Sequence, residues 1–328
     1  MEKHDANQND ERRAAIISAD ANRYVKYWTD AEQLKPATPR IWATQDGQLS
    51  NEQTQELFMA DYRKDHAAAN AEIIRRNINV GRSKEPKVPR IAKSALDAAI
   101  IAELTEKTRL KLEDTRARLA FDPAADPGAT LLTAFVANLT TENVEVAAAV
   151  IGNYIWAAKR RLMGLPVEYA LLPVIVGKQG IGKSRNVDRL LSPLSDYKLD
   201  LLDVSYLTDS RRYQTFADNY VAVLDDLPTF SMGDINILKN FITATSLKAK
   251  NYRTSEILDS PNRVTIISTA NCSVKHNQGA TRRIYEITVN KEISQQVSAG
   301  IDYTKCWQSI DENGPSPILP YLPTLTEK

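Results

Sequence analysis

The sequence of 328 residues predicts an α/β fold in which a central parallel sheet is preceded by a mainly helical N-terminal region. After residue 170, apolar runs of strand length alternate with segments of helical composition, the pattern of a parallel sheet with crossover helices. Polar residues follow several of these runs, at the edge where open α/β sheets place their sites. Before residue 80, Ala, Glu, Gln and Arg predominate, a composition typical of helices.

Residues 1–90 are expected to form the helical N-terminal region, with a flexible start. The aromatic residues of this stretch include Tyr24, Tyr27, Trp28, Trp42, Phe58 and Tyr62. The segment Lys35-Pro-Ala-Thr-Pro39 should separate two helical stretches, because proline interrupts helical hydrogen bonding. Residues 81–90 contain one glycine, two prolines and five charges of mostly one sign, which is typical of an exposed connector.

Residues 91–165 predict a second helical region. A charged helix should run over Ser94–Ala120, with Ser94 as its cap and the proline- and glycine-rich residues 122–128 as its stop. In residues 144–162, apolar side chains recur at helical spacing and form one stripe. This second helix should therefore be buried on one side.

A basic cluster closes the second helix. Lys159, Arg160 and Arg161 fall in its last turn, just before the stop signals Gly164 and Pro166. Cations at this position are stabilised by the helix dipole, which explains the cluster without any ligand. Contact with DNA phosphates is the alternative interpretation.

A glycine-rich loop follows the first apolar run of the sheet. Gly177-Lys-Gln-Gly-Ile-Gly-Lys-Ser184 matches the P-loop pattern G-x-x-x-x-G-K-[ST] at every fixed position. Its backbone N–H groups can surround phosphate oxygens, Lys183 can reach the β- and γ-phosphates, and Ser184 can bind Mg²⁺. A helix over Ser184–Leu191 would point its positive end at the same phosphates. The residues predicted to bind ATP are Gly177, Lys178, Gln179, Gly180, Ile181, Gly182, Lys183, Ser184 and Arg185.

Five apolar runs predict the strands. The run before the loop contains Pro173, which cannot donate to a central ladder, so this strand should begin at Pro173 or Val174. The other strands are predicted at residues 197–204, 220–226, 264–271 and 284–289. All five would lie in a P-loop ATPase domain over residues 166–310, and the proline-rich residues 311–328 would form an irregular tail.

Two carboxylates and an amide follow predicted strands. One of Asp225 and Asp226 could hold Mg²⁺ while the other polarises the attacking water. Asn271 ends the next strand and could place its amide on the γ-phosphate or on that water. Each of these residues could instead complete a turn, because Asp and Asn are common where strands end.

Basic residues lie on both sides of Asn271 in the sequence. Arg282 and Arg283 precede the last strand, where an arginine could neutralise transition-state charge or could be a solvated turn residue. Residues 238–253 interleave basic side chains with Phe241 and Tyr252, which suits single-stranded DNA or, alternatively, a solvated surface. The basic residues of this segment that could contact DNA are Lys239, Lys248, Lys250 and Arg253.

The composition limits the class of protein. With 43% hydrophobic and 25% charged residues, it is ordinary for a globular protein, and the net charge of +1 requires any nucleic-acid contact to be local. Two cysteines and three histidines exclude a disulfide framework and a recurrent structural zinc site, which favours a reduced compartment. Without a signal sequence or a long apolar run, a cytoplasmic protein that does not span a membrane is expected.

Taken in chain order, these motifs resemble the superfamily 3 helicases of small viruses and satellite phages and, more closely, the virulence-associated protein E family of P-loop ATPases. The corresponding segments are Gly177–Ser184 as Walker A, Val221–Asp226 as Walker B, residues 238–253 between motifs B and C, Ile267–Asn271 as motif C and Thr281–Ile284 as the arginine motif. The resemblance covers Val144 to Val289. It implies an AAA+-type ring ATPase, hexameric when active, that uses ATP and Mg²⁺ and grips single-stranded DNA in a central pore.

Two functions are consistent with this resemblance. The first is a DNA helicase in replication of a phage, satellite or mobile element, in which residues 91–165 would form a collar or lid on the motor. The alternative is a nucleotide-switched ATPase in mobile-element interference or phage defence, assembled with a protein partner through residues 1–90. No paired-acid strand or zinc-type Cys/His set precedes residue 120, so the primase activity of larger relatives is not expected.

Overall fold

A computed structural model describes residues 2–38, 41–44, 47–78, 88–209, 213–227, 232–250, 257–273 and 283–326. The chain divides into unit 1, Met1–Asp114, and unit 2, Thr115–Lys328, and the boundary falls inside helix α4 (Lys93–Leu119). Functional domains that divide at residues 90 and 165 stay a prediction. None of the described helices combines the length and the apolar character needed to cross a membrane.

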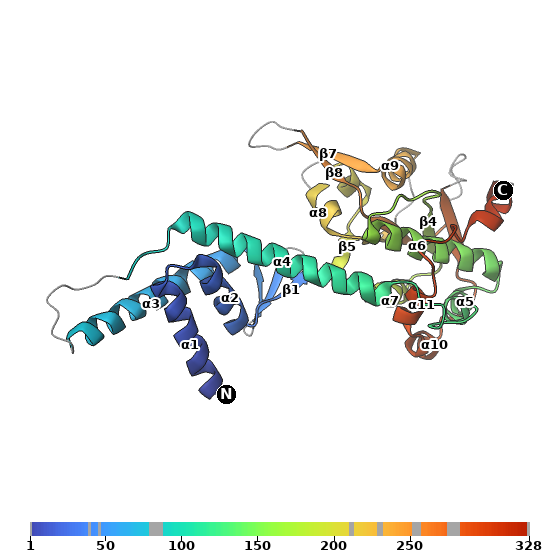
Figure 1. The fold of residues 1–328 in the computed structure, drawn as a ribbon. Helices are drawn as coiled ribbons and strands as arrows, with labels where there is room; N and C mark the ends of the chain where they lie inside the picture. Colours follow the sequence, from blue (N-terminus) through green and yellow to red (C-terminus); the bar gives the residue numbers. More distant parts are fainter. Residues whose placement is uncertain are drawn as a thin grey trace. The chain divides into compact units, whose positions relative to one another are not determined.

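Unit 1 contains helices and a small antiparallel sheet (Figure 1). Its elements before α4 are α1 (Glu2–Ile17), α2 (Ala21–Ala31), β1 (Lys35–Thr38), β2 (Ile41–Thr44), β3 (Gly47–Ser50) and α3 (Asn51–Ile78). The strands pair in the order β1-β2-β3, so β1 is an edge strand, where its Pro36 is tolerated. The sequence predicted only a helix break at this position.

Aromatic side chains form the core of unit 1. Tyr24, Trp28 and Phe58 are fully buried, and the rings of Trp28 and Phe58 meet edge to face with centroids 5.1 Å apart. Trp42, from β2, is also buried, and its indole N–H donates to Asn51 Oδ1 over 2.5 Å. Most of the aromatic residues noted in the sequence therefore pack inside this unit.

Unit 2 is built on a five-stranded parallel sheet, as predicted. The strands are β4 (Leu172–Val176), β5 (Lys198–Leu201), β6 (Val221–Leu227), β9 (Thr265–Ala270) and β10 (Ile284–Thr288). They lie in the order β10-β4-β9-β6-β5, so the P-loop strand β4 is inside the sheet. Every residue of β4 and β9 is buried. The α/β fold class, with a central parallel sheet that follows a mainly helical region, is confirmed.

Helices and one strand pair surround this sheet. The helices are α5 (Thr130–Leu139), α6 (Val144–Met163), α7 (Lys183–Leu191), α8 (Tyr213–Asp218), α9 (Met232–Thr243), α10 (Gln295–Gly300), α11 (Tyr303–Gln308) and α12 (Leu322–Thr326). Strands β7 (Ser246–Lys250) and β8 (Ile257–Pro261) form a separate antiparallel pair. Helix α12 lies in the segment for which the sequence suggested an irregular tail.

The start of β4 differs from the prediction. The strand begins at Leu172, whose N–H donates to Arg283 O over 2.7 Å on the β10 side. Because successive residues face opposite neighbours, the nitrogen of Pro173 faces β9, and pairing with β9 starts only at Val174. The missing N–H therefore interrupts no hydrogen bond, and the proline fits inside the strand.

The basic cluster of α6 is structural. The side chain of Lys159 is fully buried, with Nζ 2.7 Å from Glu312 Oε2, and burial lowers the pKa of Lys159. Arg160 donates to Glu312 O over 2.7 Å, and Arg161 donates to Ile242 O over 3.0 Å. These cations thus hold α6 against the rest of unit 2, which favours the interpretation without DNA.

Candidate functional site

The loop between β4 and α7 depends on its glycines. Gly180 and Gly182 have φ values of +81° and +91°, in the left-handed region that glycine adopts without strain. A Cβ atom added at Gly182 would lie 2.8 Å from Gln295 Nε2. Helix α7 then begins at Lys183, so its N-terminal N–H groups open toward the loop.

A cavity of about 770 Å³ lies beside this loop, at the carboxyl edge of the sheet. Residues 179–185 line one side of it, and Asp225, Thr269 and Asn271 line it from the ends of β6 and β9. Its volume falls in the range of about 300–1,000 Å³ that is usual for small-molecule sites. Residues from the predicted Walker A, Walker B and motif C segments thus line one cavity that can hold a nucleotide, whereas Gly177 and Lys178 are not part of its lining.

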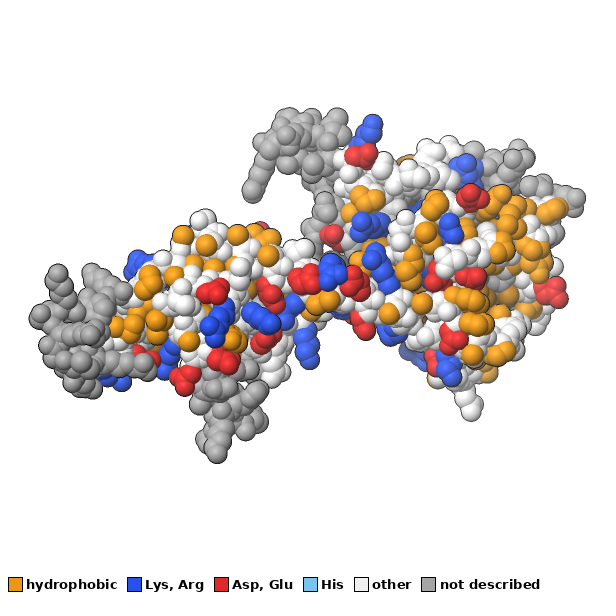
Figure 2. Space-filling view, in the orientation of Figure 1, with side chains coloured by type: hydrophobic (Ala, Val, Ile, Leu, Met, Phe, Trp, Pro, Cys, Tyr) orange, Lys and Arg blue, Asp and Glu red, His pale blue; other side chains and the backbone are white. Residues whose placement is uncertain are grey.

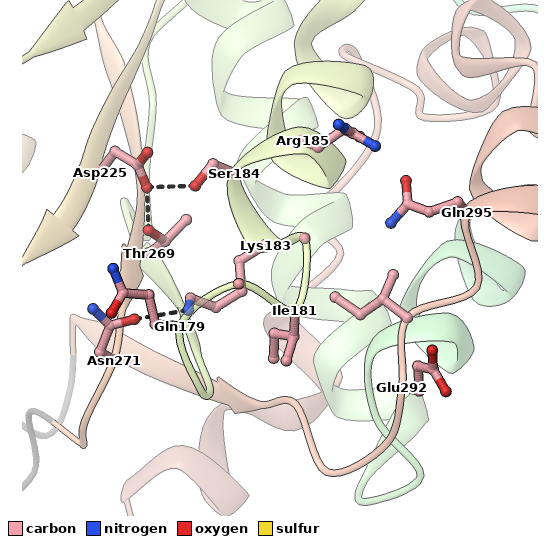
Figure 3. Close-up of a pocket in the computed structure, with 13 residues that line it drawn as sticks. Gln179, Ile181, Lys183, Ser184, Arg185, Asp225, Thr269, Asn271, Glu292 and Gln295 are labelled. Carbon is pink, nitrogen blue, oxygen red and sulfur yellow. Dashed lines mark hydrogen bonds between the residues drawn. The ribbon is translucent and has the colours of Figure 1, made fainter.

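Lys183 is held in place by three oxygens. Its Nζ donates to Gly177 O over 2.8 Å and to Lys178 O over 2.9 Å. It also donates to Asn271 Oδ1 over 2.9 Å (Figure 3). The residue is only 6% exposed, so the cation is fixed within the loop. A phosphate that enters the cavity would meet a preplaced positive charge.

Asp225 accepts hydrogen bonds from two hydroxyl groups. Ser184 Oγ donates to Asp225 Oδ1 over 2.8 Å, and Thr269 Oγ1 donates to the same oxygen (Figure 3). The register places two residues of β6 opposite one of β9, between the pairs Leu224–Ser268 and Leu227–Ala270. Such a bulge turns a side chain away from the regular alternation of the strand. It accounts for the contact of Asp225 with the P-loop.

The side-chain oxygens of Ser184 and Asp225 are hard ligands, which fit Mg²⁺. This ion is usually held by one or two carboxylates together with substrate phosphates and water. Ser184 and Asp225 supply a hydroxyl and a carboxylate oxygen 2.8 Å apart. Among the described residues there is no group of three His, Cys, Asp or Glu side chains that could form an all-protein metal cage. The side chain of Asp226 lies outside the described part of the chain.

The predicted arginine motif lies at the other edge of the sheet. Arg283 directly precedes β10, and Ile284 pairs with Leu172 at the start of β4. The guanidinium Nη1 of Arg283 donates to Lys239 O over 3.4 Å. Arg283 is therefore separated from the P-loop of its own chain by the length of a strand. Arg282 lies outside the described residues.

The predicted DNA-contacting residues lie on different elements. Lys239 is on α9 and Lys248 is exposed on β7, whereas Arg253 and the side chain of Lys250 lie outside the described residues. Phe241 is only 4% exposed, and its ring packs 5.0 Å from that of Phe216. Phe241 is therefore a core residue, and the expectation that it stacks on DNA bases is wrong.

Several residues of the site were missed in the sequence. Glu292, Ile293 and Gln295 line the cavity from the segment after β10, and Thr269 lines it from β9. The first three could have been found, because the chain leaves the last parallel strand at the same carboxyl edge. Thr269 gave no separate signal beside Asn271.

A buried hydrogen-bond chain supports the loop from behind. Asn186 Nδ2 donates to Gly182 O over 2.8 Å, and Asn186 Oδ1 accepts from Ser298 Oγ. Ser298 Oγ in turn accepts from Asn138 Nδ2 over 2.9 Å. These residues come from α7, α10 and α5, which are far apart in the sequence. No local pattern therefore indicated this series of hydrogen bonds. All three are buried, and their side-chain polar groups form hydrogen bonds with one another and with the backbone of Gly182 and Ser294.

A parallel sheet with a glycine loop, a buried loop lysine and a Ser–Asp pair at its carboxyl edge defines the class of P-loop α/β proteins. The model of the virulence-associated protein E-like domain matches residues 124–310, more than half of the sequence. The chain belongs to this family. A search of curated proteins gave no match.

Solved structures with low sequence identity resemble the fold in part. The NrS-1 C-terminal region is 14% identical, with a TM-score of 0.46 over 64% of this chain and 53% of that one. The chain thus corresponds to about half the length of the NrS-1 chain. A structure of JCV helicase is 12% identical, with a TM-score of 0.35 over 76% of each chain.

Proposed function

We propose that the chain is a Mg²⁺-dependent ATPase that moves on single-stranded DNA as a ring oligomer, a hexamer by resemblance, in replication of a phage or mobile element. One observation carries the proposal. Side chains from the start of α7 and from the ends of β6 and β9 meet in one cavity, where Lys183 contacts Asn271 and Ser184 contacts Asp225. Membership of the virulence-associated protein E-like family supports the same function.

The roles of the described residues follow from their positions, and the role of Asp226 follows from its place in the sequence. Lys183 neutralises charge on the β- and γ-phosphates, and the loop N–H groups hold their oxygens. Ser184 and Asp225 hold Mg²⁺, which when bound offsets the charge that develops on the phosphates. Asn271 orients the attacking water or the γ-phosphate, and Asp226 accepts a proton from that water.

A second function, a nucleotide-controlled switch, is favoured by the contact between Lys183 and Asn271. A γ-phosphate bound to Lys183 would compete with Asn271 Oδ1 for the N–H groups of Lys183 Nζ. Asn271 would then move with the residues that follow β9, so nucleotide binding would alter another surface. Unit 1 lies outside the family match and could hold the partner of such a switch.

One experiment separates the two functions. ATP turnover is measured with and without single-stranded oligonucleotide, and particle mass is measured in the same solutions by light scattering. Stimulation by DNA in a particle of ring size supports the helicase. Turnover that ignores DNA, in a monomer or in a complex with another protein, supports the switch. Lack of turnover under all conditions would contradict both.

A further inference from the structure

Charge on the surface is mixed, so binding of nucleic acid requires local sites. On the face shown in Figure 2, basic and acidic side chains are interspersed on both units. Unit 1 contains a cavity of about 530 Å³ between α3, the residues before α4 and the first turn of α4. The cations Arg63, Arg90 and Lys93 line it, and no carboxylate does so among the described residues. This cavity is therefore locally electropositive.

A buried histidine adds a hydrogen-bond donor to the cavity. The N–H of Val88 donates to Asn70 Oδ1 over 2.8 Å, which fixes the orientation of the Asn70 amide. Its Nδ2 group then faces His66 Nδ1 at 3.2 Å and donates to it. With Nδ1 as the acceptor, the proton of the neutral ring is on Nε2.

His66 Nε2 has no partner among the described residues, although His66 is only 8% exposed. A buried N–H without an acceptor costs free energy comparable to a lost hydrogen bond. His66 lines the same cavity as Arg63 and Arg90. A ligand that supplies an acceptor oxygen and negative charge would satisfy both the ring and the arginines.

The N-terminus of helix α4 also makes the electrostatic potential of the cavity more positive. It begins at Lys93, its first turn contains no acidic residue, and Lys93 and Leu96 line the cavity. The N-terminus of this 27-residue helix therefore adds unneutralised positive potential. The rings of Tyr62 and His66 are tilted by 44° with centroids 5.8 Å apart, and both residues are buried, so they are not platforms for bases.

We propose that this cavity binds the phosphate backbone of a nucleic-acid strand. A phosphodiester carries one negative charge, whereas the cavity presents three cations and a neutral donor, which suits successive phosphates better than a single one. Arginine guanidinium groups match phosphate oxygens with two parallel hydrogen bonds. The contact would be independent of base sequence. It concerns unit 1 and does not depend on ATP hydrolysis in unit 2.

The test compares two charge-matched double variants of the full chain without nucleotide. Arg63→Gln with Arg90→Gln removes two cavity cations, and Lys26→Gln with Lys64→Gln removes two exposed cations of unit 1 outside the cavity. Binding of a fluorescent oligothymidylate of about 20 nucleotides is measured by anisotropy at several salt concentrations. The cavity pair should lose about tenfold or more in affinity per arginine. Its salt slope should fall by about 1.4.

His66 gives an independent reading. His66→Leu removes the donor, so the affinity should fall while the salt slope stays the same, because no charge is removed. His66→Gln restores an N–H donor and should recover affinity. A merely structural role would change the thermal midpoint of both variants without this difference in DNA binding.

Three results would overturn the proposal. Equal losses in the cavity pair and the control pair would indicate general electrostatics. If the unaltered chain does not bind the oligonucleotide, a nucleic-acid strand is not the ligand of this cavity. Displacement of the oligonucleotide by inorganic phosphate at constant ionic strength, in the wild type but not in the cavity pair, would identify a free phosphate as the ligand instead.

Discussion

Asp225 is the residue on which the two hydroxyl groups of the site converge. Because Ser184 Oγ donates to it over 2.8 Å, Asp225 is a carboxylate that the structure places beside the hydroxyl predicted to bind Mg²⁺. The sequence offered both acids without a choice between them. The strand bulge at Asp225 is a property of the pairing with β9, which no local pattern contains.

The roles proposed for the two acids predict distinct effects. Asp225→Asn should remove the Mg²⁺-dependent part of nucleotide affinity and slow hydrolysis about 100-fold or more, because the metal loses an anionic ligand. Asp226→Asn should keep ATP bound with its usual Mg²⁺ dependence but stall hydrolysis, because an amide does not accept the proton of water. Titration of a fluorescent ATP analogue with and without Mg²⁺, beside turnover, separates them. The opposite pattern would reverse the two roles.

Lys183→Ala tests the buried lysine. The substitution removes the charge that meets the phosphates but leaves the loop glycines, so nucleotide binding and turnover should be abolished in a folded chain. Lys291→Ala, at an exposed residue outside the cavity lining, is the matched control and should behave as the wild type. Equilibrium dialysis measures nucleotide binding, phosphate release measures turnover, and circular dichroism shows whether the chain is folded. Wild-type turnover in folded Lys183→Ala would remove the P-loop from the mechanism.

At the scale of elements, the basic residues at the end of α6 stabilise unit 2 through buried contacts. Lys159→Met should leave the Glu312 carboxylate, which is 5% exposed, without its cation and destabilise unit 2 by about 3–5 kcal/mol. Adding Glu312→Leu should restore much of the stability, because no unpaired charge then remains. Urea unfolding followed by tryptophan fluorescence measures both. An unchanged midpoint in Lys159→Met would show that the ion pair does not stabilise the fold.

Strand β7 contains Lys248 and Lys250, two of the residues that the sequence predicts to contact DNA. Lys248→Ala with Lys250→Ala should weaken single-stranded DNA binding and lower the salt slope by about 0.7 for each phosphate that the variant no longer neutralises. Lys291→Ala with Lys305→Ala changes the charge equally at other exposed positions of unit 2. Anisotropy with one oligonucleotide compares the two pairs. If their slopes agree, the lysines of β7 belong to a solvated surface.

The elements differ in how far their sequences determine them. The P-loop and the position of α6 were predicted correctly because their signals, a fixed glycine pattern and an apolar stripe, lie within a few residues of each other. The expectation that α6 is buried on one side is wrong, because every residue from Val150 to Lys159 is buried, on all faces of the helix. The β1–β3 sheet was missed because Pro36 indicates a break unless its place on an edge is known. The contacts of Asn138 with Ser298, 160 positions later, depend on the packing of α5 on α10 and cannot be read locally.

For the whole molecule, the arginine motif raises the question of how many chains make one site. Arg283 stands at the amino edge of β10, and Lys183 stands beyond the carboxyl edge of β4. The five paired residues between these edges span about 16 Å of parallel strand. An arginine side chain does not cover this distance to the phosphates of its own chain. If Arg283 contacts ATP, it must therefore do so in a neighbouring subunit.

The last prediction is that Arg282 or Arg283 acts on the nucleotide of another copy of the chain. Arg282→Ala or Arg283→Ala should bind ATP nearly as the wild type but hydrolyse it about 10³–10⁵ times more slowly, the usual contribution of an arginine finger. An inactive Lys183→Ala subunit keeps its arginines, and an arginine variant keeps its P-loop. Mixing the two should therefore restore part of the turnover, and the recovery should grow with protein concentration. Recovery that is absent while light scattering shows co-assembly would contradict the shared site and require a self-contained ATPase.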